Sequence, residues 1–135
     1  MLETKMLARL KHVLPTCMFE SIETSTTLGF PDIVYGHGDV LGVAELKEIS
    51  RKPLNRFTVP WRPGQLAWYK NYRKKYSIST PYLLILTIVE DWFIIDDIKE
   101  TYNMHDITHF YLGKNKDLMK NRIHLYNYLF SCWHD

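Results

Sequence analysis

Residues 29–49 read GFPDIVYGHGDVLGVAELKEI, and they carry the most informative pattern in the chain. Alternating residues rich in β-branched side chains, over 31–35 and again over 40–49, are typical of strands. The glycine-containing turn 36–39 between them is short enough to reverse the chain. The sequence therefore predicts a β-hairpin at this point.

Two acids and a lysine are expected to meet on one face of the hairpin. Side chains alternate along a strand, so Glu45 and Lys47 point to one face. Asp32, on the neighbouring strand, comes close to that face. Neighbouring carboxylates repel each other unless a cation neutralises them, and oxygen-only ligation favours Mg²⁺ or Mn²⁺. We therefore expect a divalent-metal site in which Lys47 orients a water and stabilises developing negative charge.

The rest of the chain predicts further helices and strands around the hairpin. Leu7, Leu10 and Leu14 form an apolar row on a helix over 2–14. The other expected elements are strands over 18–24, 81–89 and 92–95, helices over 65–76 and 116–130, a turn over 25–29 and a basic loop over 51–63. This α-β-β-β-α-β-β-α order predicts an α/β fold, a mixed central sheet flanked by helices. The 135 residues suffice for a single domain over 1–135.

A Pro-Asp, a β-hairpin and then Glu-X-Lys form the signature of the PD-(D/E)XK nuclease superfamily, which this chain resembles from about Glu3 to about Val89. The Gly-x-Pro-Asp opening, with Gly64-Gln65 and Trp68 on the following helix, resembles the small phage- and virus-type replication-repair nucleases. Phage and archaeal Holliday-junction resolvases are similar in size and element order. The resemblance implies a restriction-endonuclease-like core.

The resemblance also implies roles for particular residues. In such families the hairpin aspartate and glutamate bind metal together with the main-chain carbonyl between Glu and Lys. These ligands correspond to Asp32, Glu45 and the carbonyl of Leu46, with Lys47 as the catalytic lysine. A glutamine on the following helix is often part of the site, which fits Gln65.

A further carboxylate from the first helix belongs to the superfamily's site, and three residues compete for that role. Glu3 stands four residues before Leu7 on the apolar row, although an acid there also complements the helix dipole. Glu23 matches some phage sequences. Glu20 differs from Glu23 in strand parity, so the two cannot share a face unless the strand has a bulge. We rank Glu3 first, Glu23 second and Glu20 third.

Positive charge is concentrated in one part of the chain, although the net charge is only +2. Residues 51–76 hold eight basic side chains and no acid, whereas acids gather over 90–106. We expect a nucleic acid to bind the basic loop through Arg51, Lys52, Arg56 and Arg62. The aromatic residues Trp68, Tyr69, Tyr72 and Tyr76 are either core or a base-stacking platform.

Other features argue against other classes of protein. The longest apolar run, 82–89, is too short to span a bilayer, and the charged N-terminus does not resemble a signal peptide. Cys17 and Cys132 are far apart, which favours reduced thiols in a cytoplasm. His105 and His109 have zinc-ligand spacing but no second pair, which favours surface histidines.

These observations predict a Mg²⁺-dependent endonuclease that hydrolyses DNA, with Mn²⁺ able to substitute and no small-molecule cofactor. Branched DNA is the expected substrate, because so small a chain has little room for base-reading elements. Two symmetric cuts in a junction would require a homodimer, and 125–133 offers apolar residues for a core or a dimer. The alternatives are a restriction-like or repair nuclease on duplex or flap DNA, and a catalytically silent nucleic-acid-binding module.

Overall fold

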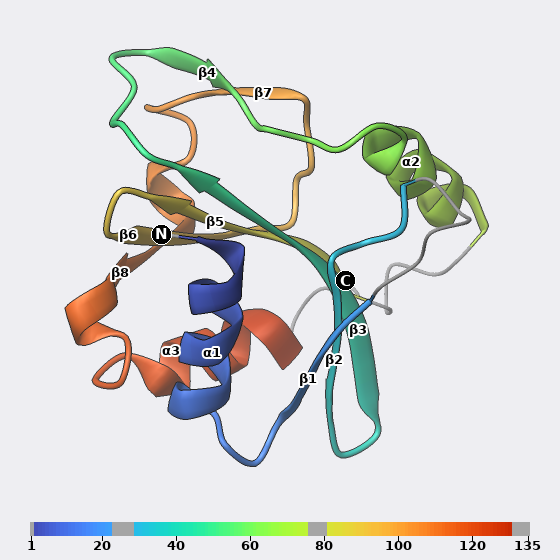
Figure 1. The fold of residues 1–135 in the computed structure, drawn as a ribbon, viewed down its shortest axis with the longest axis vertical. Coiled ribbons are helices and arrows are strands. Elements are labelled where there is room, and N and C mark those ends of the chain that lie inside the picture. The colour runs from blue at the N-terminus through green and yellow to red at the C-terminus, as the bar shows by residue number, and fades with distance from the viewer. Residues whose placement is uncertain (1, 23–28, 76–80, 131–135) are drawn as a thin grey trace.

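A six-stranded sheet in the order β1-β2-β3-β5-β6-β8 forms the centre of the molecule (Figure 1). The computed structural model describes residues 2–22, 29–75 and 81–130. The strands of this sheet are β1 (Met18–Ser21), β2 (Ile33–His37), β3 (Val40–Ile49), β5 (Tyr82–Ile88), β6 (Asp91–Ile95) and β8 (Tyr111–Lys114). Strands β3 and β5 are parallel and the other neighbouring pairs are antiparallel, so the sheet is mixed as predicted.

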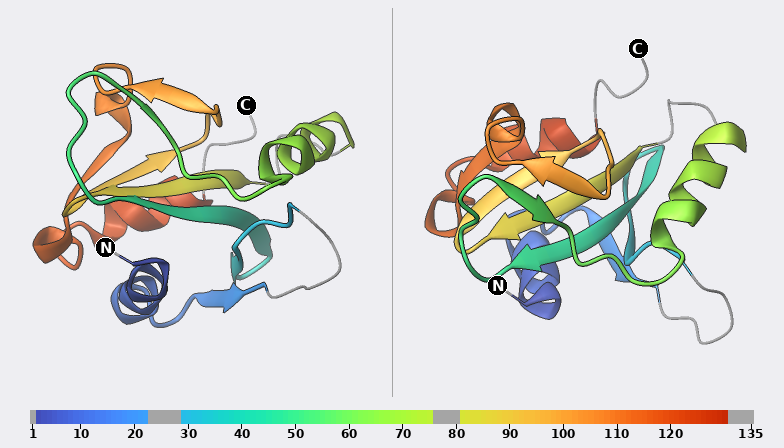
Figure 2. Two further views of the ribbon diagram at one scale, coloured as in Figure 1. Left: turned by 45° about the horizontal axis from the view of Figure 1, so that its top comes forward. Right: turned by 90° about the horizontal axis from the view of Figure 1, so that it is seen from above.

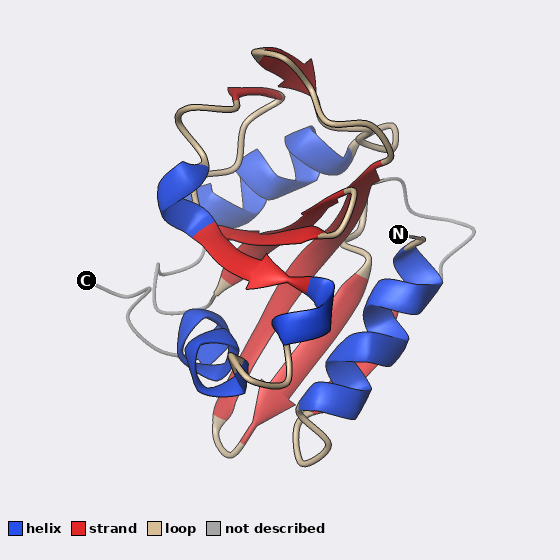
Figure 3. Ribbon diagram, turned by 90° about the vertical axis from the view of Figure 1, so that its left-hand side faces the viewer, coloured by secondary structure: helices blue, strands red, loops and turns tan. Residues whose placement is uncertain are grey.

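Helices cover both faces of the sheet (Figures 2 and 3). Helices α1 (Glu3–Val13) and α3 (Arg122–Phe130) share one hydrophobic core with one face. The opposite face packs against α2 (Gln65–Lys75) and a two-stranded ribbon of β4 (Arg56–Thr58) and β7 (Thr101–Asn103). The chain between the parallel strands β3 and β5 carries β4 and α2, because parallel neighbours need a long crossover.

Side chains of β3 alternate between these two cores as the sequence predicts. Ala44 and Leu46 are buried in the core of α1 and α3, so Glu45 and Lys47 face the other way. The pairing of β2 with β3 ends at Ile33 and Ala44, so no strand of the described residues pairs with the later part of β3 on that side. This open edge is where the candidate site lies.

Three short strands were not predicted, although the predicted fold class is confirmed. β4 lies inside the expected loop and pairs with β7, while β8 joins the edge of the main sheet beside β6. Each has only three or four residues, too few for a clear alternating pattern.

Two predicted helical patterns are shifted. Helix α1 buries Met6, Leu10 and Val13, and Glu3 lies three residues before Met6 on the same row. Of the predicted leucines, Leu10 and Leu14 are buried, whereas Leu7 is only partly buried. Helix α3 begins at Arg122 instead of residue 116, after a 3-10 turn and further turns that bury Leu118.

Further predictions concern membrane-spanning helices, the two cysteines and the aromatic residues of α2. Within the described residues, no helix is both long enough and apolar enough to cross a membrane. Cys17 is a free thiol, whereas Cys132, Glu23 and Tyr76 lie outside the described residues. Trp68, Tyr69 and Tyr72 pack against the core under α2, which favours their interpretation as core residues.

Candidate active site

Asp32 stands just before β2 and forms the centre of a charged cluster. Its Oδ2 accepts a hydrogen bond from the Leu46 N–H at 2.7 Å and forms an ion pair with Lys47 Nζ at 3.2 Å. Its Oδ1 accepts hydrogen bonds from Arg62 Nη2 at 2.6 Å and from Gln65 Nε2 at 3.2 Å. Asp32 is only 9% exposed, so this carboxylate is held in one orientation by four partners.

Glu45 lies beside Asp32 and is fully buried. Its Oε1 accepts from the Asp32 N–H at 3.2 Å and from Gln65 Nε2 at 2.8 Å, and its Oε2 accepts from the Tyr82 hydroxyl at 2.6 Å. Burial raises the pKa of Glu45 to about 8, against an ordinary value of 4.5, despite these donors. Burial and the neighbouring Glu45 also raise the pKa of Tyr82, so the tyrosine keeps its proton and donates a hydrogen bond to Glu45.

Lys47 is 1% exposed and connects Asp32 to the first helix. Its Nζ lies 3.2 Å from Asp32 Oδ2 and 3.5 Å from Glu3 Oε1. Glu3 is half-exposed, and burial followed by the nearby Asp32 raises its pKa. Glu3 therefore reaches the cluster, whereas Glu20 is exposed on β1 and Glu23 lies outside the described residues.

Gln65 is oriented by the first turn of α2. Its Oε1 accepts the Arg62 N–H at 2.9 Å, an arrangement like a capping box. The amide nitrogen must therefore face the two carboxylates, and Gln65 donates to both. Gln65 thus acts as a bridge that holds Asp32 and Glu45 together.

A close contact between two glycines sets the distance from Asp32 to α2. Gly29 has φ +88°, and a Cβ added there would lie 2.2 Å from the carbonyl oxygen of Gly64. A side chain at residue 29 would therefore push apart the loops that carry Asp32 and Gln65.

The carboxylate oxygens of Asp32 and Glu45 are of the type that divalent cations such as Mg²⁺ prefer as ligands. No three His, Cys, Asp or Glu side chains in 2–22, 29–75 and 81–130 form a ready metal cluster, so Asp32 and Glu45 need a different third ligand. The N–H and C=O of one residue point to the same side of a strand. Because the Leu46 N–H donates to Asp32, the Leu46 carbonyl also points toward the side of Asp32. Burial is the main cause of the raised pKa of Glu45, and the charge of Lys47 offsets it only in part.

The basic residues separate into two groups. Arg62 contacts Asp32 directly, which sequence reasoning missed, and its side chain is 57% exposed. Arg51, Lys52 and Arg56 are exposed on the segment after β3, and Arg56 donates to the Thr101 hydroxyl at 3.4 Å.

Sequence reasoning also missed Tyr82, although a tyrosine at the start of a buried strand needs a partner for its hydroxyl.

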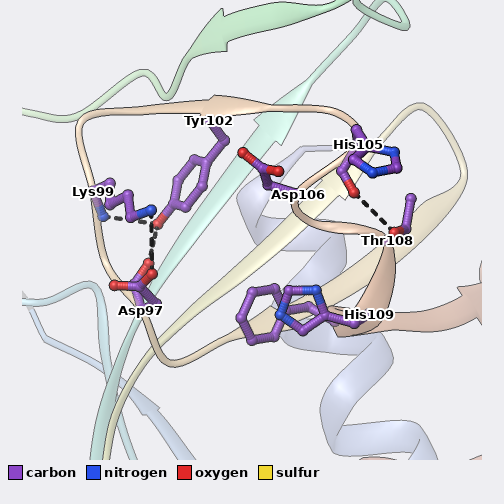
Figure 4. A pocket seen from close by; sticks show the side chains of 8 residues that line it. Asp97, Lys99, Tyr102, His105, Asp106, Thr108 and His109 are labelled. Atoms are coloured by element: carbon purple, nitrogen blue, oxygen red, sulfur yellow. Dashed lines mark hydrogen bonds and ion pairs between the residues drawn. The ribbon is translucent and has the colours of Figure 1, made fainter.

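His105 and His109 lie at a separate pocket of about 410 Å³ beside β7 (Figure 4). Asp97, Lys99 and Asp106 share its lining. Both histidines are exposed, and neither belongs to a metal cluster among the residues that the structure describes. The interpretation as surface histidines fits this arrangement.

Comparison with known proteins gives a result at the level of the fold. No protein-family model matches the chain, and no curated protein matches it either. Its structure is similar to that of Hjc, a Holliday junction resolvase from the archaeal hyperthermophile Archaeoglobus fulgidus, with a TM-score of 0.52 and 13% sequence identity. The similarity covers 84% of this chain and 96% of Hjc. The fold is restriction-endonuclease-like. At this sequence identity the likeness is one of fold.

Proposed function

We propose that this chain is a divalent-metal-dependent endonuclease that hydrolyses phosphodiester bonds of DNA, with branched DNA as its preferred substrate. One observation carries the proposal: buried Asp32, Glu45 and Lys47 converge at the open edge of β3, with Glu3 and Gln65 in contact with them. The fold-level likeness to the resolvase Hjc supports DNA as the substrate.

In the proposed reaction, water attacks phosphorus and one P–O bond breaks, which leaves a phosphate on one fragment and a hydroxyl on the other. Mg²⁺ or Mn²⁺, held by Asp32, Glu45 and the Leu46 carbonyl, would supply Lewis-acid activation of the phosphate and of the attacking water. Lys47, fixed by two carboxylates, stabilises the negative charge that develops on the phosphoryl oxygens. Glu3 positions Lys47.

A catalytically silent binding module is the alternative from another class. Such a module would gain nothing from acids such as Asp32 and Glu3 beside a polyanion, because like charges repel. The intact cluster around Lys47 therefore favours catalysis.

Branched DNA is proposed over sequence-specific duplex DNA for a structural reason. Of the helices in the described residues, α1 and α3 bury one side against the sheet and α2 packs beside the catalytic cluster. Few elements therefore remain to read bases in a major groove. Two cuts in one junction would require two copies of the site, so we also propose a homodimer.

The test is cleavage of four-way, flapped and linear DNA of one sequence, each in Mg²⁺ and in EDTA. We expect cleavage in Mg²⁺ alone, fastest on the four-way junction. Equal rates on all three substrates would contradict the proposed preference for branched DNA, and full activity in EDTA would contradict the metal mechanism.

Lys47→Ala separates binding from catalysis in the same assay. The variant should bind junction DNA like the wild type in EDTA and lose cleavage in Mg²⁺, because Lys47 is assigned to charge stabilisation. Cleavage at the wild-type rate would show that the lysine has no catalytic role.

A further inference from the structure

The Asp32 carboxylate has a partner for each of its lone pairs. A carboxylate group offers about two lone pairs on each oxygen. The Leu46 N–H and Lys47 Nζ lie 2.7 and 3.2 Å from Oδ2. Arg62 Nη2 and Gln65 Nε2 lie 2.6 and 3.2 Å from Oδ1. A cation can therefore bind Asp32 only where one of these partners leaves.

Arg62 is the partner that can leave at the lowest cost. Its side chain is 57% exposed, whereas the other three partners are at most 2% exposed. A buried donor that is separated from its acceptor is left without water or a partner, which is unfavourable. An exposed guanidinium regains water when it leaves a carboxylate. Arg62 is therefore the partner that a cation on Asp32 Oδ1 would displace.

The loop that carries Arg62 does not depend on this ion pair. The Arg62 N–H donates to Gln65 Oε1 at 2.9 Å, and the Arg62 carbonyl accepts the Gln65 N–H at 3.1 Å. The guanidinium also contacts the Phe30 carbonyl at 3.4 Å, but that carbonyl accepts Gln65 Nε2 at 3.3 Å as well. The main chain of Arg62 and the Phe30 carbonyl thus keep their partners when the side chain moves.

A phosphate of bound DNA suits a guanidinium that is displaced beside a nuclease site. The planar N–H groups of arginine match phosphate oxygens in pairs, and the side chain stays charged at any physiological pH. No acid occurs in residues 51–76, so this segment offers Arg62 no other carboxylate. A cation on Asp32 would contact the phosphate that is cleaved, so a phosphate would lie close to the displaced side chain.

We propose that Arg62 exchanges partners: it pairs with Asp32 in the absence of DNA and moves to a phosphate of bound DNA, which frees Asp32 Oδ1 for the cation. This inference rests on the proposed nuclease function. Arg62 thereby opposes metal binding until DNA is present. Coupling of this kind is reciprocal, so DNA and the cation should each strengthen the binding of the other.

Arg62→Ala tests the exchange, with Mn²⁺ as the probe and no DNA present. In isothermal titration calorimetry the variant should bind Mn²⁺ about fivefold more tightly than the wild type, which must first break the ion pair with Asp32. The control Arg122→Ala removes the same charge from an exposed position on α3 and should bind Mn²⁺ like the wild type. Equal or weaker Mn²⁺ binding by Arg62→Ala would overturn the exchange.

The same variant should bind DNA more weakly, so the two affinities should change in opposite directions. The affinity of wild type and Arg62→Ala for a four-way junction is measured in EDTA at several salt concentrations. The slope of log affinity against log salt should be smaller for the variant by about 0.9, the value for one lost phosphate contact. An unchanged slope would show that Arg62 does not reach the DNA, which would also overturn the exchange.

Two further substitutions separate the loss of charge from a loss of structure. Arg62→Met keeps the apolar stem without the charge, so its Mn²⁺ affinity should match that of Arg62→Ala. Arg62→Lys keeps the charge, so its Mn²⁺ affinity should lie close to that of the wild type. Weaker Mn²⁺ binding by Arg62→Met than by the wild type would overturn the exchange, as would binding by Arg62→Lys that is as tight as that of Arg62→Ala.

The titration also distinguishes this inference from the proposed function on which it rests. A wild type that binds no Mn²⁺, with or without DNA, would refute the proposed metal-dependent nuclease. A wild type that binds Mn²⁺ at least as tightly as Arg62→Ala would refute the exchange and leave the nuclease proposal intact.

Discussion

Replacing Glu45 with glutamine should change how stability depends on pH, because this carboxylate is fully buried. Burial raises its pKa to about 8 from an ordinary value of 4.5. Between these two values the folded protein keeps a proton that the unfolded chain has released. The stabilising effect of that proton is complete below about pH 4.5 and is lost as the pH rises through the folded-state pKa near 8.

The size of the effect follows from the shift. A difference of one pKa unit corresponds to about 1.36 kcal/mol. As the pH rises from about 5 to about 8, the contribution of Glu45 to the free energy of unfolding should therefore fall by about 3 kcal/mol. The glutamine variant has no such group. Its stability relative to wild type should therefore rise by that amount over the same interval, while contributions from other titrating groups cancel in the comparison.

Urea unfolding of wild type and Glu45→Gln in EDTA, at several pH values from about 5 to 8, measures this difference. A difference that stays constant with pH would show that the folded state imposes no penalty on the Glu45 carboxylate. If the wild type instead became more stable relative to the variant as the pH rises, the pKa of Glu45 would be lowered in the folded state. That result would contradict the buried environment of Glu45 described above.

Two further variants test the periphery of the site. Glu3→Gln should lower metal-dependent cleavage sharply and change the free energy of unfolding by less than about 1 kcal/mol, because its ion pair with Lys47 is half-exposed; wild-type cleavage would remove Glu3 from the site. Changing Arg51, Lys52 and Arg56 together to glutamine should weaken DNA binding, and the slope of log affinity against log salt should shrink by about 0.9 for each phosphate that the variant no longer neutralises. An unchanged slope would mean that this segment faces away from DNA.

The part of the site that was predictable lies within a short stretch of chain. Asp32, Glu45 and Lys47 belong to one hairpin, so strand alternation and one tight turn are sufficient to bring them together. The turn itself requires Gly38, whose φ is +62°, and this glycine could be recognised from the sequence.

The contacts that were not predictable join residues far apart in sequence. Arg62 reaches Asp32 across 30 residues, and Tyr82 reaches Glu45 across 37. Neither pair shares a strand, a helix or a periodic pattern, so only the packing of α2 and β5 against the hairpin brings them together. Strands β4 and β7 were missed for the same reason, since each is defined by its pairing with the other.

Expectations failed where local periodicity was ambiguous. Helix α1 has apolar residues at adjacent positions, and packing buries Met6 fully but Leu7 only in part, while the predicted Leu10 and Leu14 are buried. The segment before α3 buries Leu118 as a helix would, but does so with turns, and Ile123 is left exposed. Tertiary contacts decide between such alternatives.

Single-turnover cleavage of a four-way DNA junction by wild type and Asp32→Asn, in saturating Mg²⁺, tests whether Asp32 belongs to a metal-dependent nuclease site. We predict that wild type cuts the junction and that Asp32→Asn is slower by at least about 100-fold, because the activating cation loses one of its ligands. The matched variant Asp39→Asn, in the exposed hairpin turn, should cut like the wild type. Cleavage by Asp32→Asn at the wild-type rate would contradict the account.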